Sequence, residues 1–284
     1  MSFALGTARW IAAARAREST RPDRLFVDPW AEQLAGQSGA AALAASEQAS
    51  GLANAYLPVR TRFFDDALAD ASWADQVVLL GAGMDTRAQR LVWAAGSVVF
   101  EVDHPQVLQA KHSVLSAVAA RCERREVGVD LEQDWSGALV EAGLDSSRPT
   151  MWLAEGLLFY LAAPAVAALL STAALLSRAR ARFAADLFGS GLLRLPSMQA
   201  HLASRERQGR PAPFTCDEPE ALFGVNGWTT SHVVQPGDSQ ASYGRLASRS
   251  QEQHLPTSPA PRNYLVVADR AAPGIEASTG TGNT

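Results

Sequence analysis

Short apolar stretches alternate with helical patterns through the middle of the chain. Five stretches are mainly apolar and have the length of a buried strand, at 77–80, 98–102, 126–131, 150–155 and 182–186. Three segments between them carry apolar residues at the three- and four-residue spacing of a helix, at about 85–94, 105–119 and 164–177. Strands that alternate with helices predict an α/β fold, in which a mostly parallel sheet has helices on both faces.

Residues 1–75 carry helical spacing without a strand pattern. Apolar residues recur at helical intervals in 7–20 and again in 60–71, and Asp28-Pro29 is typical of a helix start, because proline is tolerated at the first helical position. The Ala-, Gly- and Ser-rich stretch 38–53 predicts a loosely packed helical connection. We therefore expect a helical N-terminal cap over 1–75 that can close over a ligand at the edge of the sheet.

The C-terminal third departs from the alternation. Two β-like runs, 228–234 and 263–268, predict a terminal antiparallel pair at one edge of the sheet. The proline-containing stretch after the last parallel strand predicts a helix and a loop over the active site. We therefore expect one domain over 76–270 with a lid at about 188–260, and a disordered tail over the Gly-, Thr- and Ser-rich residues 271–284.

Composition and charge narrow the class of protein. The 284 residues have a net charge of −4 and suffice for one sizeable core. Arginine supplies the positive charge, with Lys111 as the only lysine, and no basic run suggests nucleic acid as a partner. Cys122 and Cys216 lie far apart without metal-ligand spacing, which favours a reducing compartment. The chain shows neither a leader pattern nor the roughly eighteen uninterrupted apolar residues of a membrane span, so we expect a soluble, cytoplasmic protein.

The sequence Val77-Val-Leu-Leu-Gly-Ala-Gly-Met-Asp-Thr-Arg87 joins the first predicted strand to a helix through two glycines. Gly81 and Gly83 allow a tight turn and a close approach of the backbone to a ligand, as in nucleotide-binding β-α-β units. Thr86 stands where a dinucleotide fingerprint has its third glycine, and Asp85 places a carboxylate where a pyrophosphate would lie. Both features disfavour NAD, whereas the cationic amino group of S-adenosylmethionine would be attracted to Asp85.

The next two predicted strands also end in polar residues. Glu101 and Asp103 alternate, so in a regular strand both point to one face and could hold the ribose hydroxyls. Alternatively, one acid binds the ligand and the other caps the following helix. Asp130 could accept a hydrogen bond from the adenine amine while Leu131 packs on the ring, although an acid at a strand end is more often a solvated turn residue.

The fourth predicted strand and the preceding helix add further candidates. Glu155 and Gly156 fall at the carboxyl edge, where ligands of open α/β sheets bind. Tyr160 could line the substrate side or belong to the core. The guanidinium of Arg60 could bind a ligand carboxylate through two hydrogen bonds, or it could lie on the surface. The histidines and cysteines form no cluster with ligand spacing, so we expect no metal site.

Taken together, these segments resemble the leucine carboxyl methyltransferase family of S-adenosylmethionine-dependent enzymes, including bacterial relatives that methylate small molecules such as polyketide carboxylic acids. The resembling segments are Thr7-Ala-Arg-Trp10, Val59-Arg-Thr-Arg-Phe-Phe-Asp-Asp66, Leu80-Gly-Ala-Gly-Met-Asp-Thr-Arg87, Phe100-Glu-Val-Asp-His-Pro105, Val129-Asp-Leu131 and Trp152-Leu-Ala-Glu-Gly-Leu157, and more weakly Gly227-Trp228 and Tyr243-Gly-Arg245. The resemblance implies a Rossmann-like class I methyltransferase fold with a seven-stranded sheet.

The resemblance also implies roles for individual residues. Together with the strand-end arguments, it gives a cofactor-binding set of Arg60, Gly81, Gly83, Asp85, Glu101, Asp103, Asp130, Leu131, Glu155 and Gly156. In that set Arg60 would hold the methionine carboxylate, Asp103 the ribose and Asp130 the adenine. The N-terminal basic contact of the family could come from Arg9 or Arg15.

The predicted reaction is transfer of a methyl group to the carboxylate of a small, secondary-metabolite-like molecule. A carboxylic acid with a pKa of about 4 is already anionic at neutral pH. Orientation and exclusion of water would therefore supply the catalysis without a general base. Arg194, Arg205, Arg207 or an arginine of the cap could neutralise the substrate, and Tyr160 and His201 are candidate catalytic residues.

Four other functions fit parts of the sequence. A phenol or hydroxyl O-methyltransferase would need a base, for which His201 or His232 would serve. Eukaryotic members of the family methylate a protein C-terminus, but the predicted lid carries no likeness that would place such a partner. A NAD-dependent oxidoreductase is disfavoured by the glycine turn, and a non-catalytic binding protein by the intact Asp103, Asp130 and Arg60. The sequence leaves the methyl acceptor and the oligomeric state open.

Overall fold

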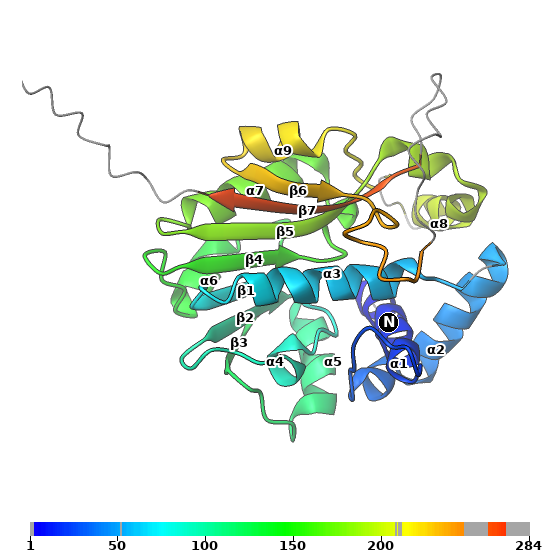
Figure 1. The fold of residues 1–284 in the computed structure, drawn as a ribbon, viewed down its shortest axis with the longest axis horizontal. Coiled ribbons are helices and arrows are strands. Elements are labelled where there is room, and N and C mark those ends of the chain that lie inside the picture. The colour runs from blue at the N-terminus through cyan, green and yellow to red at the C-terminus, as the bar shows by residue number, and fades with distance from the viewer. Residues whose placement is uncertain (1–2, 52, 208, 210–211, 247–260, 271–284) are drawn as a thin grey trace, which may run out of the picture.

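A single seven-stranded sheet organises the chain. The computed structural model describes residues 3–51, 53–207, 209, 212–246 and 261–270, and within them the strand order is β3-β2-β1-β4-β5-β7-β6 (Figure 1). The strands are β1 (Gln76–Leu80), β2 (Val98–Asp103), β3 (Glu123–Gly128), β4 (Thr150–Ala154), β5 (Ala181–Phe188), β6 (Thr229–Val234) and β7 (Asn263–Arg270). Strands β1 to β5 are parallel, whereas β7 runs antiparallel to both β5 and β6. The predicted mostly parallel sheet and its antiparallel pair at one edge are confirmed.

Helices surround this sheet and precede it in the chain. Their bounds are α1 (Phe3–Ser19), α2 (Ala31–Ser50), α3 (Tyr56–Asp70), α4 (Arg87–Arg90), α5 (Pro105–Leu115), α6 (Ser136–Glu141), α7 (Ala163–Leu175), α8 (Pro196–Arg207) and α9 (Pro219–Val225). Two short 3₁₀ helices, η1 (Leu158–Tyr160) and η2 (Ser190–Arg194), follow β4 and β5. The predicted tail at 271–284 and residues 247–260 of the predicted lid lie outside the described residues.

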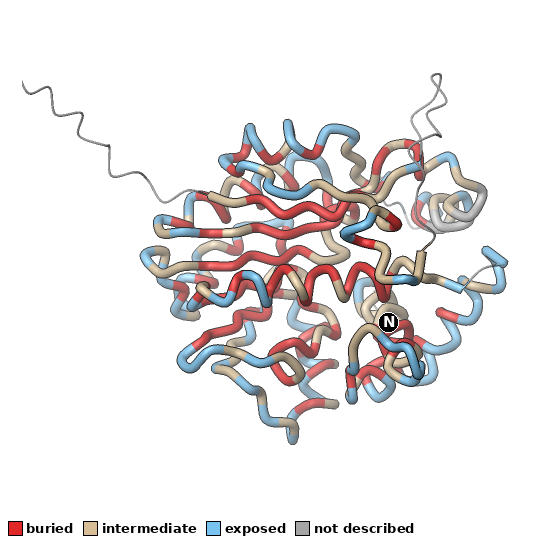
Figure 2. Tube along the Cα trace, in the orientation of Figure 1, coloured by how far each residue is buried: buried red, intermediate tan, exposed pale blue. Residues whose placement is uncertain are grey.

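The central strands are buried on both faces, as their apolar sequences require. In β1, Val78 and Leu80 point into one core, which α6, α7 and α9 complete. Val77 and Leu79 point into the opposite core, which includes Phe64 of α3. Figure 2 shows the strands as a buried layer and Figure 1 shows α3 crossing one face of it. Alternate side chains of one strand therefore hold two helical layers together.

The carboxyl ends of β1, β2, β3 and β4 meet at one edge of the sheet. Leu80 pairs with Val102, and Asp103 at the end of β2 pairs with Gly128 at the end of β3. From β1 the chain proceeds to β2 on one side and later to β4 on the other, so the strand order reverses between β1 and β4. Ligands of open α/β sheets bind at such a reversal, which places the candidate site next to β1.

Helices α1 and α2 pack against each other beside this edge. They pack tightly at Gly39, where an added Cβ would lie 2.4 Å from the carbonyl oxygen of Arg9. The predicted loose connection at 38–53 is therefore largely an ordered part of α2, although Gly36, with φ of 56°, kinks that helix. The tight packing fixes α1, which covers the site described below.

Two other expectations need correction, and two short helices were not predicted. The helix predicted at about 85–94 is only the four residues of α4, because the indole of Trp93 donates a hydrogen bond to the carbonyl of Arg87 and the chain turns away. The short helices α6 and α9 escaped the periodicity argument, since six or seven residues are too few to show a helical repeat. The range 188–260 contains α9 and the sheet strand β6 as well as η2 and α8, so it is not one lid insertion.

Candidate functional site

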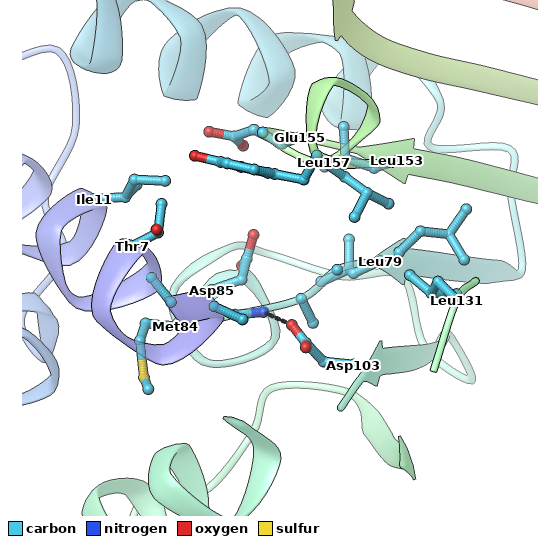
Figure 3. A pocket seen from close by; sticks show the side chains of 18 of the residues that line it. Thr7, Ile11, Leu79, Met84, Asp85, Asp103, Leu131, Leu153, Glu155 and Leu157 are labelled. Carbon is cyan, nitrogen blue, oxygen red and sulfur yellow. Dashed lines mark hydrogen bonds between the residues drawn. The ribbon is translucent and has the colours of Figure 1, made fainter. Parts of the chain in front are cut away.

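A cavity of about 320 Å³ opens at the carboxyl edge of the sheet. Its floor consists of the segments that follow β1, β2, β3 and β4, and α1 lies over it with Thr7 and Ile11 pointing inward (Figure 3). Nine of the ten predicted cofactor-binding residues line it: Arg60, Gly81, Gly83, Asp85, Asp103, Asp130, Leu131, Glu155 and Gly156. Segments separated by up to a hundred residues therefore converge as the sequence predicts.

The glycine turn after β1 is held by the acid at the end of β2. Gly81 and Gly83 have positive φ angles of 67° and 49°, which favour glycine. One carboxylate oxygen of Asp103 accepts a 2.7 Å hydrogen bond from the amide of Gly83 (Figure 3). The other accepts a hydrogen bond from the amide of His104. Burial raises the pKa of Asp103, while these two hydrogen bonds oppose the rise. Asp103 thus joins the glycine turn to the start of α5.

The segment after β3 closes one end of the cavity. Leu131 is buried and presents an apolar side chain, and Asp130 is exposed and accepts a 2.9 Å hydrogen bond from the amide of Glu132. An apolar surface beside a carboxylate acceptor suits the face and the amine of a purine. The carboxylates of Asp130 and Glu132 make this end of the cavity unlike a phosphate site, which is built from backbone amides and cations.

Arginines and carboxylates alternate at the opposite end. One carboxylate oxygen of Glu155, which follows β4, lies 3.1 Å from Nε of Arg60, and the other lies 2.7 Å from a terminal nitrogen of Arg87. Arg87 also pairs with Asp85 and with Asp65 of α3. Burial raises the pKa of Asp85, but the charge of Arg87 outweighs it and the pKa falls to about 2. Asp85 was expected to attract a cationic group of the ligand, but in the structure its negative charge is already paired with Arg87.

Asp186 completes this network and was missed by the sequence argument. It is fully buried at the end of β5 and accepts hydrogen bonds from Arg60 at 3.1 Å, from the hydroxyl of Tyr56 at 2.8 Å and from the amide of Gly156 at 2.6 Å. An aspartate within the otherwise apolar run Phe183-Ala-Ala-Asp186 was the available signal, because an unpaired carboxylate would be costly there. Arg60 is therefore shared by two carboxylates before any ligand arrives.

Gly156 lies against the guanidinium of Arg60. Its φ is 68°, and an added Cβ would lie 3.0 Å from both terminal nitrogens of Arg60. The glycine is thus required twice, once by its backbone conformation and once by its neighbour. Glycine at this position lets the loop after β4 approach the arginine closely enough for Asp186 to bind both.

The N-terminal helix supplies one of its two candidate arginines to the cavity. Arg15 lines the cavity, binds Asp28 at 2.9 Å and donates to the carbonyl of Met84 in the glycine turn. Asp28 in turn accepts a 2.8 Å hydrogen bond from the hydroxyl of Thr86. Arg9 instead points to Ser38 of α2 and does not line the cavity. Thr86, which argued against a dinucleotide, therefore ties the turn to the cap.

Glu101 lies apart from the other predicted ligand residues. Its carboxylate is fully buried and pairs with Nζ of Lys111 at 2.8 Å and with Arg124 at 2.6 Å. It does not line the cavity. The expectation that Glu101 shares the ribose with Asp103 is therefore corrected: both acids leave the same face of β2, but the first meets the cations of α5 and β3.

The candidate catalytic and substrate residues are placed unequally. Tyr160 of η1 lines the cavity, and the guanidinium carbon of Arg205, in α8, lies 5.7 Å from the centroid of its ring. Arg205 is buried, whereas Arg194 and Arg207 are exposed. His232 is exposed on the edge strand β6 and does not line the cavity.

The remaining candidate, His201, lies in α8, but its side chain is outside the described part of the structure. Burial raises the pKa of Tyr160 above that of an ordinary phenol. Its hydroxyl therefore stays protonated at neutral pH and can donate a hydrogen bond but not accept a proton. Among the described side chains, no group of three or more His, Cys, Asp and Glu residues has the arrangement of a metal site.

Comparisons with known proteins agree with this geometry. The family model described as leucine carboxyl methyltransferase matches residues 8–174, more than half of the chain. A protein of Saccharopolyspora erythraea named as an S-adenosyl-L-methionine-dependent methyltransferase is 40% identical over 267 residues, covering 87% of this chain and 90% of that protein. A relative from Streptomyces coelicolor with the same description is 39% identical over 260 residues, covering 85% and 88%.

Solved structures share the fold at low sequence identity. A crystal structure of a protein from Thermobifida fusca, described as a methyltransferase, aligns with a TM-score of 0.62 at 17% identity and covers 93% of this chain and 94% of its own. A DUF574 family protein from Streptomyces avermitilis aligns with a TM-score of 0.59 at 14% identity, covering 91% and 96%. In the described part of this chain, the helices are too short or too polar to cross a membrane.

Proposed function

The chain belongs to the leucine carboxyl methyltransferase family and is an S-adenosylmethionine-dependent methyltransferase, and from this premise we propose that it methylates a carboxylate of a small molecule to give a methyl ester. The observation that carries the proposal is the pairing of the acids next to Arg60 and Arg87. Glu155, Asp85 and Asp186 are each bound by at least one of these arginines. An anionic acceptor can therefore approach a cofactor bound at this end of the cavity without meeting an uncompensated negative charge.

The residues fit the cofactor part by part. We assign the ribose to Asp103, because a carboxylate can accept hydrogen bonds from both hydroxyls of a diol. Asp130 and Leu131 suit the adenine, as an acceptor for its amine and as an apolar surface for its ring. The mixed array of Arg60 and Glu155 suits a zwitterionic amino acid group, in which each charge finds an opposite partner.

When bound, S-adenosylmethionine supplies a methyl group on a positively charged sulfur. Transfer to a carboxylate forms an oxygen–carbon bond, breaks the sulfur–carbon bond and leaves its electron pair on sulfur, so no proton has to move. The protein then has only to orient the acceptor and exclude water, and α1 lies over the cavity where it can do so. Tyr160, with its raised pKa, fits the role of a hydrogen-bond donor to the acceptor.

Arg205 is the arginine that we assign to the acceptor carboxylate. Arg205 does not itself line the cavity, but it is buried against the ring of Tyr160, which does, whereas Arg194 and Arg207 are exposed. A guanidinium withdrawn from water attracts a carboxylate more strongly than an exposed one, because solvent screens it less. The acceptor class that fits is an acid with an apolar body, since Leu157 and Leu161 line the same side of the cavity.

A transfer assay tests this proposal. The enzyme is given S-adenosylmethionine tritiated in its methyl group, together with aliphatic and aromatic carboxylic acids, the matching alcohols and phenols, and a peptide ending in leucine. We expect label in the small acids, released as methanol by mild base, which is the behaviour of a methyl ester. Base-stable label in phenols or alcohols would instead indicate an ether, and label confined to the peptide would move the acceptor to a protein C-terminus.

A further inference from the structure

Lys111 is the most unusual cation of the chain. The sequence has 25 basic side chains, of which Lys111 is the only lysine. It lies in α5, is fully buried, and its Nζ is 2.8 Å from Glu101 of β2. A buried charge is rare without a partner, and a compact ammonium fits a closed space that a forked guanidinium would overfill. A chain that otherwise uses arginine throughout thus keeps a lysine at one enclosed position.

The position of Lys111 is next to the proposed ribose site. Glu101 is two residues before Asp103 on the same strand face, and α5 begins directly after His104. The pair Lys111–Glu101 therefore joins β2 to α5 on either side of the bend that presents Asp103 to the cavity. Asp103 itself binds the amide of Gly83, so this bend also fixes the glycine turn.

The charge of Lys111 reaches both acids of the turn. Burial raises the pKa of Asp103, and the ammonium acts against that rise together with the amides of Gly83 and His104. Burial likewise raises the pKa of Asp85, and Lys111 assists Arg87 in bringing it to about 2. Besides His104 and Lys111, whose charges act on Asp103, charged groups line the same cavity from the glycine turn (Asp85), from the segment after β3 (Asp130 and Glu132) and from α1 (Arg15).

We propose that Lys111 is a positioning residue for the cofactor: paired with Glu101 across the bend between β2 and α5, its ammonium holds the carboxylate of Asp103 in place for the ribose. Glu101 is then the counter-ion that allows this charge to be buried. Arg124 is a second cation that pairs with Glu101. The inference rests on the proposed assignment of Asp103 to the ribose. It gives a function to the carboxylate that the sequence had assigned to the ligand.

Two substitutions break the same ion pair from opposite sides and so separate charge from structure. Lys111→Met removes the positive charge while Glu101 keeps Arg124 as a partner, and Glu101→Gln removes the negative charge while the lysine stays. The measurement is calorimetric titration with S-adenosylhomocysteine between pH 5.5 and 8, with thermal unfolding of each variant as a control for folding.

The two variants are expected to diverge. In Lys111→Met the loss of affinity at acid pH begins at a higher pH than in the wild type, and at the acid end of the range the affinity is about tenfold below that of the wild type, equivalent to one unit in the pKa of Asp103. In Glu101→Gln the loss at acid pH begins at the wild-type pH or below it. Equal losses with superimposable pH profiles would show that the ion pair acts only on stability and would overturn the proposal.

Further variants guard against two failures. If Lys111→Met does not fold, Glu101→Gln is compared with the double variant Glu101→Gln/Lys111→Gln, which differs from it only by the ammonium. The double variant should lose affinity at the higher pH, and coincident profiles would overturn the proposal. Asp103→Asn separates this inference from its premise: wild-type affinity in that variant would remove the ribose assignment itself, and the inference with it.

Discussion

The two sides of the cavity are built from different kinds of structure. The sheet side consists of the glycine turn Gly81–Asp85, Asp103 and the pair Asp130–Leu131, all within a few residues of a strand end. The helix side consists of Thr7 and Ile11 of α1 and the loop from Leu157 to Leu161, with α8 behind it. Strand ends in a parallel sheet are fixed by their register, whereas helices and loops are fixed by side-chain packing.

Under the proposed assignments, this difference separates binding of the cofactor from binding of the acceptor. A cofactor of constant structure can be held by backbone turns and strand-end acids, and these follow from short sequence motifs. The proposed carboxylic acid acceptor is assigned to the helix side, where single side chains can change without disturbing the sheet. The predictions below test each side separately.

The largest effect is expected on the sheet side. Asp103→Ala removes the acceptor of the Gly83 amide as well as the proposed ribose ligand, so affinity for S-adenosylhomocysteine should fall about 100-fold. Calorimetric titration measures the change. Glu132→Ala is the matched control, because it removes an exposed carboxylate from the same cavity and should change the affinity less than threefold. Similar losses in both variants would contradict the assignment of Asp103.

The loop after β4 offers the second test. Gly156→Ala places a Cβ 3.0 Å from the terminal nitrogens of Arg60 and should displace this guanidinium. The affinity for S-adenosylhomocysteine should therefore fall about tenfold. Gly96→Ala is the control, since Gly96 also has a positive φ, 82°, but no atom lies within 4 Å of the added Cβ. Both substitutions should cost about 1–2 kcal/mol of unfolding free energy through the backbone, and only the first should reduce binding.

The glycine turn should also make stability depend on acid pH. The pKa of Asp85 is about 2 in the folded protein, below its usual value, so its ionised form stabilises the fold above pH 4 and this contribution is lost as the pH falls toward 2. Asp85→Asn should therefore lower the free energy of unfolding at pH 7 by about 2 kcal/mol. Denaturant unfolding at several pH values measures it, and a difference that does not shrink below pH 4 would contradict the assigned cause.

On the helix side the effect should appear in the acceptor rather than the cofactor. Arg205→Leu is expected to raise the KM for a carboxylic acid about tenfold while the affinity for S-adenosylhomocysteine stays within twofold. Arg207→Leu, two residues further along α8 and exposed, should change neither quantity. Steady-state kinetics with the best acid from the transfer assay provide the values. An equal rise in both variants would remove Arg205 from the acceptor site.

The smallest effect is expected for the histidine that a hydroxyl transferase would need. His232→Ala should leave kcat within about twofold at pH 7, because the side chain is exposed on β6 and does not line the cavity. A strong loss that is largest at low pH would instead favour a histidine base and an acceptor that must be deprotonated.

Local motifs account for what the sequence could predict. The turn at Gly81 and the acid Asp103 lie in contiguous segments whose strand and helix neighbours are recognisable, so their meeting follows from parallel strand order alone. The apolar runs likewise place β1, β2, β4 and β5 to within two residues at each end, whereas β3 begins and ends three residues earlier than expected.

The rest depends on long-range pairing that no local pattern encodes. Asp186 and Tyr56 are 130 residues apart, and nothing near either residue shows that they share a hydrogen bond. Glu101 and Asp103 have the same strand parity, so alternation could not show that one would meet Lys111 and the other the cavity. Their separation arises because α5 folds back across β2, which is a tertiary event.

Because Lys111 is buried, its chemical modification can report local opening of the protein around α5. Because it is the only lysine and fully enclosed, a reagent that acylates lysine amines finds no lysine side chain to modify while the protein is closed. Each acylated lysine therefore records a molecule in which α5 has left the sheet. The rate of acylation under native conditions would give the free energy of that local opening, and slower labelling with bound cofactor would measure how firmly the ligand holds this helix in place.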